Sequence, residues 1–218
     1  DCHRNGRRRS GSHAEAVNGP GTTGIMTHSD ITLAASATLD AADADYLISL
    51  IRSVPGFPKQ GIMFRDFMPV FADARGLRIL LDALKANLPV GIDDFDAIAG
   101  LEARGFLFGP AMAAELGKGF IAVRKAGKLP PPTCTESYSL EYGEASIEIE
   151  REAIASGERI LIVDDLIATG GSASAARDLV IQCGGTVAGF SFVMELLGLQ
   201  GLQALGDYPT SSLLTMPA

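Results

Sequence analysis

Residues 160–174 read Ile-Leu-Ile-Val-Asp-Asp-Leu-Ile-Ala-Thr-Gly-Gly-Ser-Ala-Ser, and this segment says most about the fold. Its four leading apolar residues are typical of a strand buried on both faces, as in a parallel sheet. Two adjacent acids, Asp164 and Asp165, end that strand, and a glycine-containing loop leads into a predicted helix over 173–183. Open α/β sheets bind ligands at the carboxyl ends of their strands, so a ligand site is expected here.

Apolar runs alternate with helical segments along the rest of the chain. The pattern predicts strands over 97–101, 120–123 and 187–196, and helices over 75–88 and 106–116. An earlier helix is predicted to start at the N-cap Asp40 and to be ended by Pro55 and Pro58. Buried strands separated by helices favour an α/β fold: a mostly parallel twisted sheet with helices on both faces and a small hood or flap region.

Two regions depart from this alternation. Residues 127–151 begin with a proline run and end in alternating polar and apolar residues, which predicts a hairpin or flap that projects from the sheet. Residues 1–28 lack apolar periodicity and are expected to form a disordered tail, which leaves residues 29–218 as a single domain. All three histidines lie in that tail, so catalysis by histidine in the folded part is not expected.

Composition restricts the class of protein. The 218 residues carry a formal net charge of -8, and the sequence pI is about 4.9. An acidic chain has no general basic field for nucleic acid, so no nucleic-acid partner is expected. No apolar run reaches the length of a membrane span. The three cysteines have neither disulfide-framework nor zinc-site spacing, which favours free thiols in a reducing cytoplasm.

The residues after the strand suit a sugar phosphate. Glycines let the backbone approach an anion, and successive amides at a helix start form a cradle for phosphate. Paired carboxylates would repel phosphate but suit sugar hydroxyls or a metal ion. The alternative is a capping aspartate followed by a plain turn, but two acids after an apolar strand are costly unless they are used. Neither a Walker loop nor a GxGxxG fingerprint occurs.

This segment resembles the phosphoribosyl pyrophosphate (PRPP) signature of the type I phosphoribosyltransferases. The resemblance implies that Asp164 and Asp165 hold the ribose hydroxyls. It assigns the 5-phosphate to the loop and helix start, namely Ala168, Thr169, Gly170, Gly171 and Ser172.

Four further strings are similar to the branch of this family that acts on adenine. They are Pro58–Asp66, Ala99–Gly109, Val123–Pro130 and Ser137–Gly143, and the resemblance covers about residues 40–214. It implies salvage of adenine: transfer of ribose 5-phosphate from PRPP to adenine, giving AMP and pyrophosphate. The alternatives are the same chemistry on xanthine, hypoxanthine or orotate, or a PRPP-sensing regulator without catalysis.

The resemblance also assigns the rest of the site. Pyrophosphate is expected at the loop of Glu102, Ala103 and Arg104, with the cations Arg124, Lys125 and Lys128 nearby. The base is expected at Met63, Phe64, Arg65 and Leu196. From the residues alone, Phe64 reads as a core residue. A solvated surface charge is the alternative for Arg104, but arginine suits bidentate phosphate contacts, which favours the phosphate role.

Proton transfer is assigned by the same resemblance to Glu141, which lies beside Tyr142 in the flap. The catalytic set is thus Glu141, Asp164 and Asp165. Mg²⁺ is the implied cofactor, held by substrate and water with no direct protein ligand. PRPP and adenine are the implied partners, with no membrane partner, and the family resemblance implies a homodimer.

Overall fold

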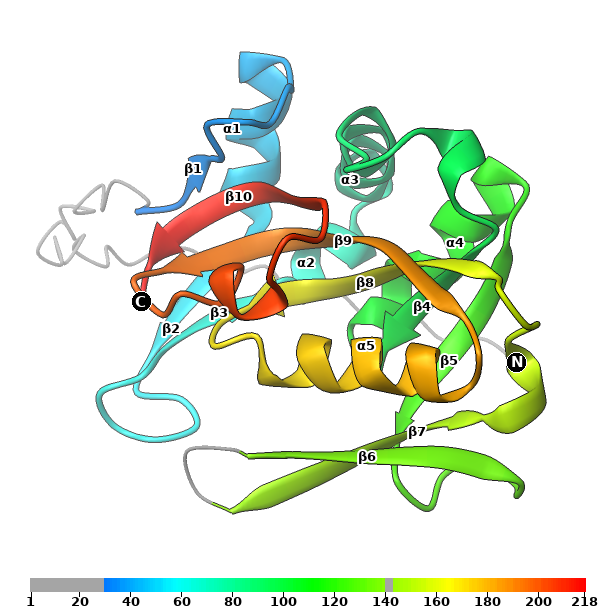
Figure 1. Ribbon diagram of the computed structural model, residues 1–218. Helices are drawn as coiled ribbons and strands as arrows, with labels where there is room; N and C mark the ends of the chain where they lie inside the picture. The colour runs from blue at the N-terminus through cyan, green and yellow to red at the C-terminus, as the bar shows by residue number, and fades with distance from the viewer. Residues whose placement is uncertain (1–29, 140–142) are drawn as a thin grey trace, which may run out of the picture.

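The computed structural model describes residues 30–139 and 143–218, and within them most strands form one eight-stranded sheet. Its strand order is β1-β10-β9-β8-β4-β5-β7-β6, and β2 and β3 form a separate pair (Figure 1). The strands are β1 Thr32–Leu33, β2 Arg52–Pro55, β3 Met63–Asp66, β4 Ala97–Leu101, β5 Gly119–Lys125, β6 Thr133–Ser139, β7 Glu144–Glu150, β8 Arg159–Ile167, β9 Thr186–Leu197 and β10 Thr210–Pro217. The α-helices are α1 Ala41–Leu50, α2 Met68–Ala72, α3 Ala74–Ala86, α4 Gly105–Leu116 and α5 Gly171–Gln182.

The five central strands, β10, β9, β8, β4 and β5, are all parallel, as predicted. Side chains along β8 alternate between two apolar cores. Leu161 and Val163 pack into one core, and Ile160 and Ile162 pack into the other. A strand buried on both faces needs this continuous apolar run.

Helices cover both faces of the sheet, which confirms the predicted α/β class. Figure 1 shows α1, α3 and α4 on one side and α5 on the other. The helices predicted over 75–88 and 106–116 correspond to α3 and α4. The side chain of Asp73 caps α3 by accepting the Gly76 N–H at 2.7 Å.

The first helix is shorter than predicted. Asp40 caps α1 by accepting the Ala42 N–H at 2.9 Å, but the helix ends at Leu50, five residues before Pro55. The predicted extension is wrong because residues 52–55 form β2, which pairs antiparallel with β3. That pairing satisfies backbone groups that a longer helix would otherwise use.

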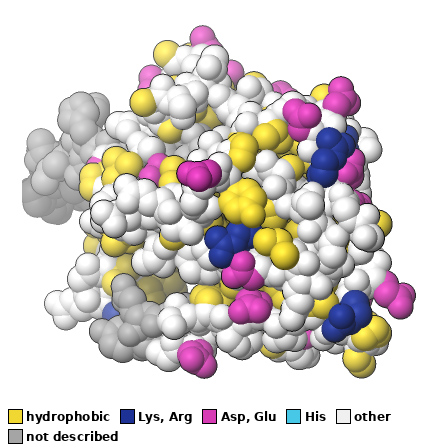
Figure 2. Space-filling model, in the orientation of Figure 1, with side chains coloured by type: hydrophobic (Ala, Val, Ile, Leu, Met, Phe, Trp, Pro, Cys, Tyr) yellow, Lys and Arg dark blue, Asp and Glu magenta, His cyan; other side chains and the backbone are white. Residues whose placement is uncertain are grey.

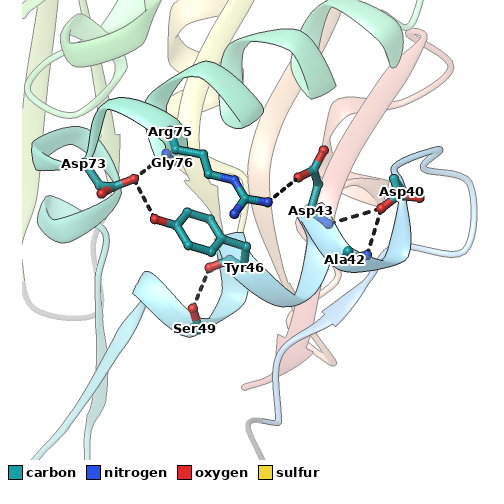
Figure 3. Close-up of polar contacts among 8 residues, drawn as sticks. All are labelled: Asp40, Ala42, Asp43, Tyr46, Ser49, Asp73, Arg75 and Gly76. Carbon is teal, nitrogen blue, oxygen red and sulfur yellow. Dashed lines mark hydrogen bonds and ion pairs between the residues drawn. The ribbon is translucent and has the colours of Figure 1, made fainter.

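Polar contacts join α1 to α3 (Figure 3). The Tyr46 hydroxyl donates to Asp73 Oδ1 at 3.0 Å, and the Arg75 guanidinium lies 4.1 Å from the Tyr46 ring centroid. Arg75 also reaches Asp43 Oδ1 on α1 at 3.1 Å. These contacts hold the helix that leads into the β2–β3 pair against the core.

The predicted hairpin within 127–151 consists of β6 and β7. β7 extends the main sheet by pairing antiparallel with the end of β5, where Arg124 faces Glu148 and Lys125 faces Ile147. The rest of the hairpin lies across α5, so this helix is enclosed between the parallel strands and β6 (Figure 1). The hairpin thereby reaches the amino-terminal end of α5.

The elements that were not predicted include α2, β1, β2 and β10. The tail predicted for residues 1–28 lies outside the described residues. Among the described helices, none combines the length and the apolar character needed to cross a membrane. On the face seen in Figure 2, the Lys and Arg side chains are separated from one another and have Asp and Glu side chains near them.

Candidate active site

The carboxyl ends of β4 and β8 lie side by side because the two strands are parallel neighbours. The residues after β4 turn at once into α4, which begins at Gly105. A Cβ atom at Gly105 would lie 3.0 Å from the Val163 carbonyl oxygen and 3.5 Å from Asp164 Oδ1. Glycine at this position therefore allows the start of α4 to approach the acidic end of β8.

The two predicted acids lie inside β8, because this strand continues to Ile167. Asp165 is buried and forms an ion pair with Arg104 Nε, so the loop after β4 is bound to the acidic strand. The Asp165 N–H donates to Asp164 Oδ1 at 2.9 Å. Burial, and then the charge of Asp165, raise the pKa of Asp164 well above its usual value.

The loop between β8 and α5 leads into the amino-terminal end of the helix. Gly170 has φ of 82°, a left-handed conformation that favours glycine. The first helical hydrogen bond runs from the Ser174 N–H to the Gly170 carbonyl at 2.8 Å. The amides of Gly171 and Ser172 therefore have no partner inside the helix, and the positive end of α5 favours an anion there.

Arg104, the two acids and the start of α5 all line one cavity of about 580 Å³. Its size falls within the usual range for small-molecule sites. Two hairpin residues that sequence reasoning did not assign, Tyr138 and Ser139, also contribute to its wall. The lining residues are Arg104, Tyr138, Ser139 and all of 164–173.

Tyr138 on the hairpin lies close enough to Asp164 for the charge of that acid to affect its ionisation. Burial, and then the charge of Asp164, raise the pKa of the Tyr138 hydroxyl. The ring also lies close to the helix start, because a Cβ atom at Gly171 would be 3.5 Å from Tyr138 Cδ2. Its position inside the Ser137–Gly143 string was the available signal for a role in this site.

The predicted pyrophosphate residues meet at the ends of β4 and β5. Glu102 Oε2 accepts the Lys125 N–H at 3.0 Å and Arg124 Nε at 3.3 Å. The hydrogen bond from the Lys125 amide is the main cause that lowers the pKa of Glu102. The Glu102–Ala103 peptide bond is cis. The Lys125 and Lys128 side chains are exposed.

The predicted base residues lie on β3 and β9. Phe64 packs edge-on against Phe57, with ring centroids 5.1 Å apart, and the Arg104 guanidinium lies 6.0 Å from the Phe64 centroid. Phe64 is thus brought beside the acidic strand. Met63 is 46% exposed, whereas Leu196 is partly buried against the core.

The Arg65 side chain is buried and turned into the protein. Its Nη2 donates to Asp30 Oδ1 and Oδ2 at 2.8 and 2.6 Å, and it also contacts Ser53 and Met216. Only its backbone groups remain for a base. Glu141 and Tyr142 lie outside the described residues.

Comparisons with known proteins agree on one family. The model of the phosphoribosyl transferase domain matches residues 87–197. The adenine phosphoribosyltransferase of Bifidobacterium adolescentis is 67% identical over 193 residues, which is 88% of this chain and 100% of that protein. That of Salinispora arenicola is 47% identical over 80% of this chain and 92% of its own length.

Solved structures give the same result. The adenine phosphoribosyltransferase of Rhodothermus marinus has a TM-score of 0.75 at 43% identity, covering 81% of this chain and 100% of that one. The Saccharomyces cerevisiae enzyme, complexed with an imino-altritol bisphosphate and adenine, has a TM-score of 0.73 at 43% identity. The match to it covers 79% of this chain and 99% of the yeast chain.

Proposed function

Because the chain belongs to the adenine phosphoribosyltransferase family, we propose that the cavity beside β8 binds PRPP and is the site of the reaction. The reaction transfers ribose 5-phosphate from PRPP to adenine and yields AMP and pyrophosphate. One observation carries the proposal: the first residues of α5, Gly171 and Ser172, line the same cavity as the acids Asp164 and Asp165. A sugar phosphate needs both kinds of group a few ångströms apart.

The 5-phosphate is assigned to the loop Ala168–Ser172. The amides of Gly171 and Ser172 would donate to its oxygens, and the Thr169 and Ser172 hydroxyls would add further bonds. The exposed Thr169 is accessible for this contact. The left-handed Gly170 sets the direction of the turn.

The ribose hydroxyls are assigned to Asp164 and Asp165. Positive charge grows on the sugar ring as the bond from C1′ to pyrophosphate breaks and adenine N9 attacks. A carboxylate below the ring stabilises that charge more in the transition state than in the ground state. Arg104, which is paired with Asp165, would lie between the acids and the departing pyrophosphate.

Adenine is assigned to the space beside Phe64, with Leu196 on the other face of the ring. An aromatic face stacks on a purine. Backbone groups of Met63 and Arg65 would read the edge of the base, since the Arg65 side chain is engaged with Asp30. The Arg104 guanidinium lies 6.0 Å from the Phe64 ring centroid, which supports a base pocket next to the proposed ribose site.

Glu141 is proposed to accept the N9 proton when adenine attacks, and to return it in the reverse direction. The string Ser137–Gly143 supports the assignment. Glu141→Ala should lower kcat about a hundredfold or more while leaving PRPP affinity, measured by calorimetry, within a few fold. Unchanged turnover would remove Glu141 from the mechanism.

Mg²⁺ is the proposed cofactor. Oxygen donors suit this hard cation, and PRPP and water would supply them, while Asp164 and Asp165 hold the ribose hydroxyls in the same cavity. When bound through PRPP oxygens and water, Mg²⁺ would neutralise charge on the leaving pyrophosphate. Arg104, Lys125 and Lys128 would add positive charge on the same side.

Three further proposals accompany the reaction. The family resemblance supports a homodimer, which light scattering would test.

A cytoplasmic location is proposed because Cys134 and Cys183 are free thiols, as expected in a reducing compartment. Residues 29–218 are proposed to act as one catalytic domain.

The decisive assay mixes the protein with PRPP, Mg²⁺ and adenine and follows AMP and pyrophosphate by chromatography. Equal amounts of both products are expected. Hypoxanthine, xanthine and orotate serve as controls and should react at least about a hundredfold more slowly, because backbone groups that fit one base edge leave the others unpaired. Absence of AMP, or equal turnover of another base, would contradict the proposal.

A further inference from the structure

Glu148 is a buried acid that the proposed reaction does not use. It lies on β7 with 4% of its surface exposed, between the buried residues Ile147 and Ile149. Its Oε1 accepts the Lys128 N–H at 2.7 Å and the Leu129 N–H at 2.8 Å. The carboxylate therefore holds the backbone of the loop that connects β5 to β6.

Hydrogen bonding keeps this carboxyl charged in spite of its burial. Burial acts to raise the pKa of Glu148, but amide donors from Gly127, Lys128 and Leu129 outweigh it and lower the pKa. Charge-assisted bonds of this kind are stronger than neutral ones. The loop is thus fixed by a buried anion, and its own peptide bonds provide the donors.

The cations that are assigned to pyrophosphate lie in this loop and on the end of β5 that leads into it. Arg124 faces Glu148 in the β5–β7 register. Its Nη1 donates to the Lys128 carbonyl at 3.1 Å, and its Nε reaches Glu102 at 3.3 Å. Arg124 therefore lies between two carboxylates, which offset its charge and make it part of the framework of the loop.

Lys125 and Lys128 differ from Arg124 in this respect. Both side chains are exposed, and within residues 30–139 and 143–218 neither ammonium group forms an ion pair. Their charges remain for an anionic ligand. The direction in which they point depends on the backbone at 125–129, which Glu102 and Glu148 hold from opposite sides.

We propose that Glu148 is a positioning residue for the pyrophosphate end of PRPP. It acts through the loop amides, and its effect is to present Lys125 and Lys128 to the pyrophosphate without contacting substrate itself. This inference rests on the proposed function. It predicts a selective effect: ligands that carry pyrophosphate should depend on Glu148, whereas adenine and AMP should not.

The test is steady-state kinetics of Glu148→Ala and Glu148→Gln in both directions of the reaction. Glu150→Ala is the matched control, because Glu150 lies on the same strand but is exposed. In Glu148→Ala, KM should rise about tenfold for PRPP and for pyrophosphate. KM for adenine and AMP, and kcat, should stay within about twofold.

Glu148→Gln keeps an oxygen that can accept both amides but loses the charge facing Arg124. Its KM for PRPP should rise about threefold, between those of the wild type and the alanine variant. This variant carries the test if Glu148→Ala does not fold. The control Glu150→Ala should match the wild type in all four constants.

Two results would overturn the inference. One is KM values for PRPP and pyrophosphate within twofold of wild type in Glu148→Ala, or in Glu148→Gln if the alanine variant does not fold. The other is an equal rise for all four ligands, which indicates a general structural role. Wild-type protein that makes no AMP would instead reject the proposed function, so the two failures are distinguishable.

Discussion

Asp164→Asn should make the ligand-free protein more stable while it impairs catalysis. Asp164 and Asp165 are adjacent carboxylates in a largely buried strand, and asparagine removes one of the two charges. The substitution keeps the side-chain oxygen that accepts the Asp165 N–H at 2.9 Å. The local backbone hydrogen bond is therefore retained, and the main change is electrostatic.

The expected gain is about 1–2 kcal/mol. Like charges a few ångströms apart repel by about 2–4 kcal/mol at an effective dielectric constant of 20. The ion pair of Asp165 with Arg104 offsets part of this repulsion. For a domain of this size each kcal/mol shifts Tm by about 2–4 °C, so Tm should rise by several degrees.

The gain should depend on pH. The folded-state pKa of Asp164 lies above its unfolded value, so the folded state binds the extra proton. The contribution of Asp164 to wild-type stability therefore falls as pH rises from about 4, the unfolded pKa, through the folded-state pKa. Asparagine does not titrate, so its advantage should be large at pH 8 and small near pH 4.

Calorimetry of wild type, Asp164→Asn and Asp165→Asn at pH 5 and pH 8 provides the assay. Asp165→Asn is the contrast, because it removes the partner of Arg104 and should bring no comparable gain. A Tm for Asp164→Asn equal to or below that of wild type at pH 8 would refute the electrostatic reasoning. Its kcat should fall at least about tenfold.

The remaining predictions concern the loop, a helix contact and a surface ion pair. Gly170→Ala should lower the free energy of unfolding by about 1–3 kcal/mol and raise KM for PRPP, because φ is +82° and a Cβ would lie 2.6 Å from a carbonyl oxygen. In Gly171→Ala the atom nearest to the new Cβ is at 3.5 Å, so the free energy of unfolding, measured by denaturant titration, should change by no more than about 0.5 kcal/mol. Tyr46→Phe removes a donor to the carboxylate that caps α3 and should lower Tm slightly with unchanged kcat. Hydrogen bonds from Arg159 lower the pKa of Asp96 to about 2. The stability lost in Asp96→Asn should therefore be evident in urea titrations above pH 4 and should disappear as pH falls from 4 through 2.

The central strands were predictable because burial on both faces leaves a simple apolar pattern. The prediction for residues 97–101 coincides with β4, and that for 187–196 lies within β9. The prediction of β8 was too short. It stopped at Val163 because acids seldom continue a buried strand, yet residues 164–167 remain paired with β9, and the charge of Asp165 is paired with Arg104.

Elements that depend on partners distant in the sequence were harder to predict from the sequence. The helical spacing of apolar residues continues to Val54, but pairing with Phe64 on β3 turns this part into a strand. The role proposed for Glu148 could not be predicted from the sequence either, because the alternating polar and apolar residues around it are typical of an ordinary hairpin with a solvated acid. Only the structure shows that the loop at 127–129 covers this carboxylate.

A crystal structure of the chain with AMP bound is the most direct test of the account. We predict phosphate oxygens within about 3.2 Å of the amides of Gly171 and Ser172, and ribose hydroxyls at Asp164 and Asp165. Phosphate bound elsewhere in the protein, or amides at the start of α5 that turn away from the nucleotide, would contradict the assignment of this site.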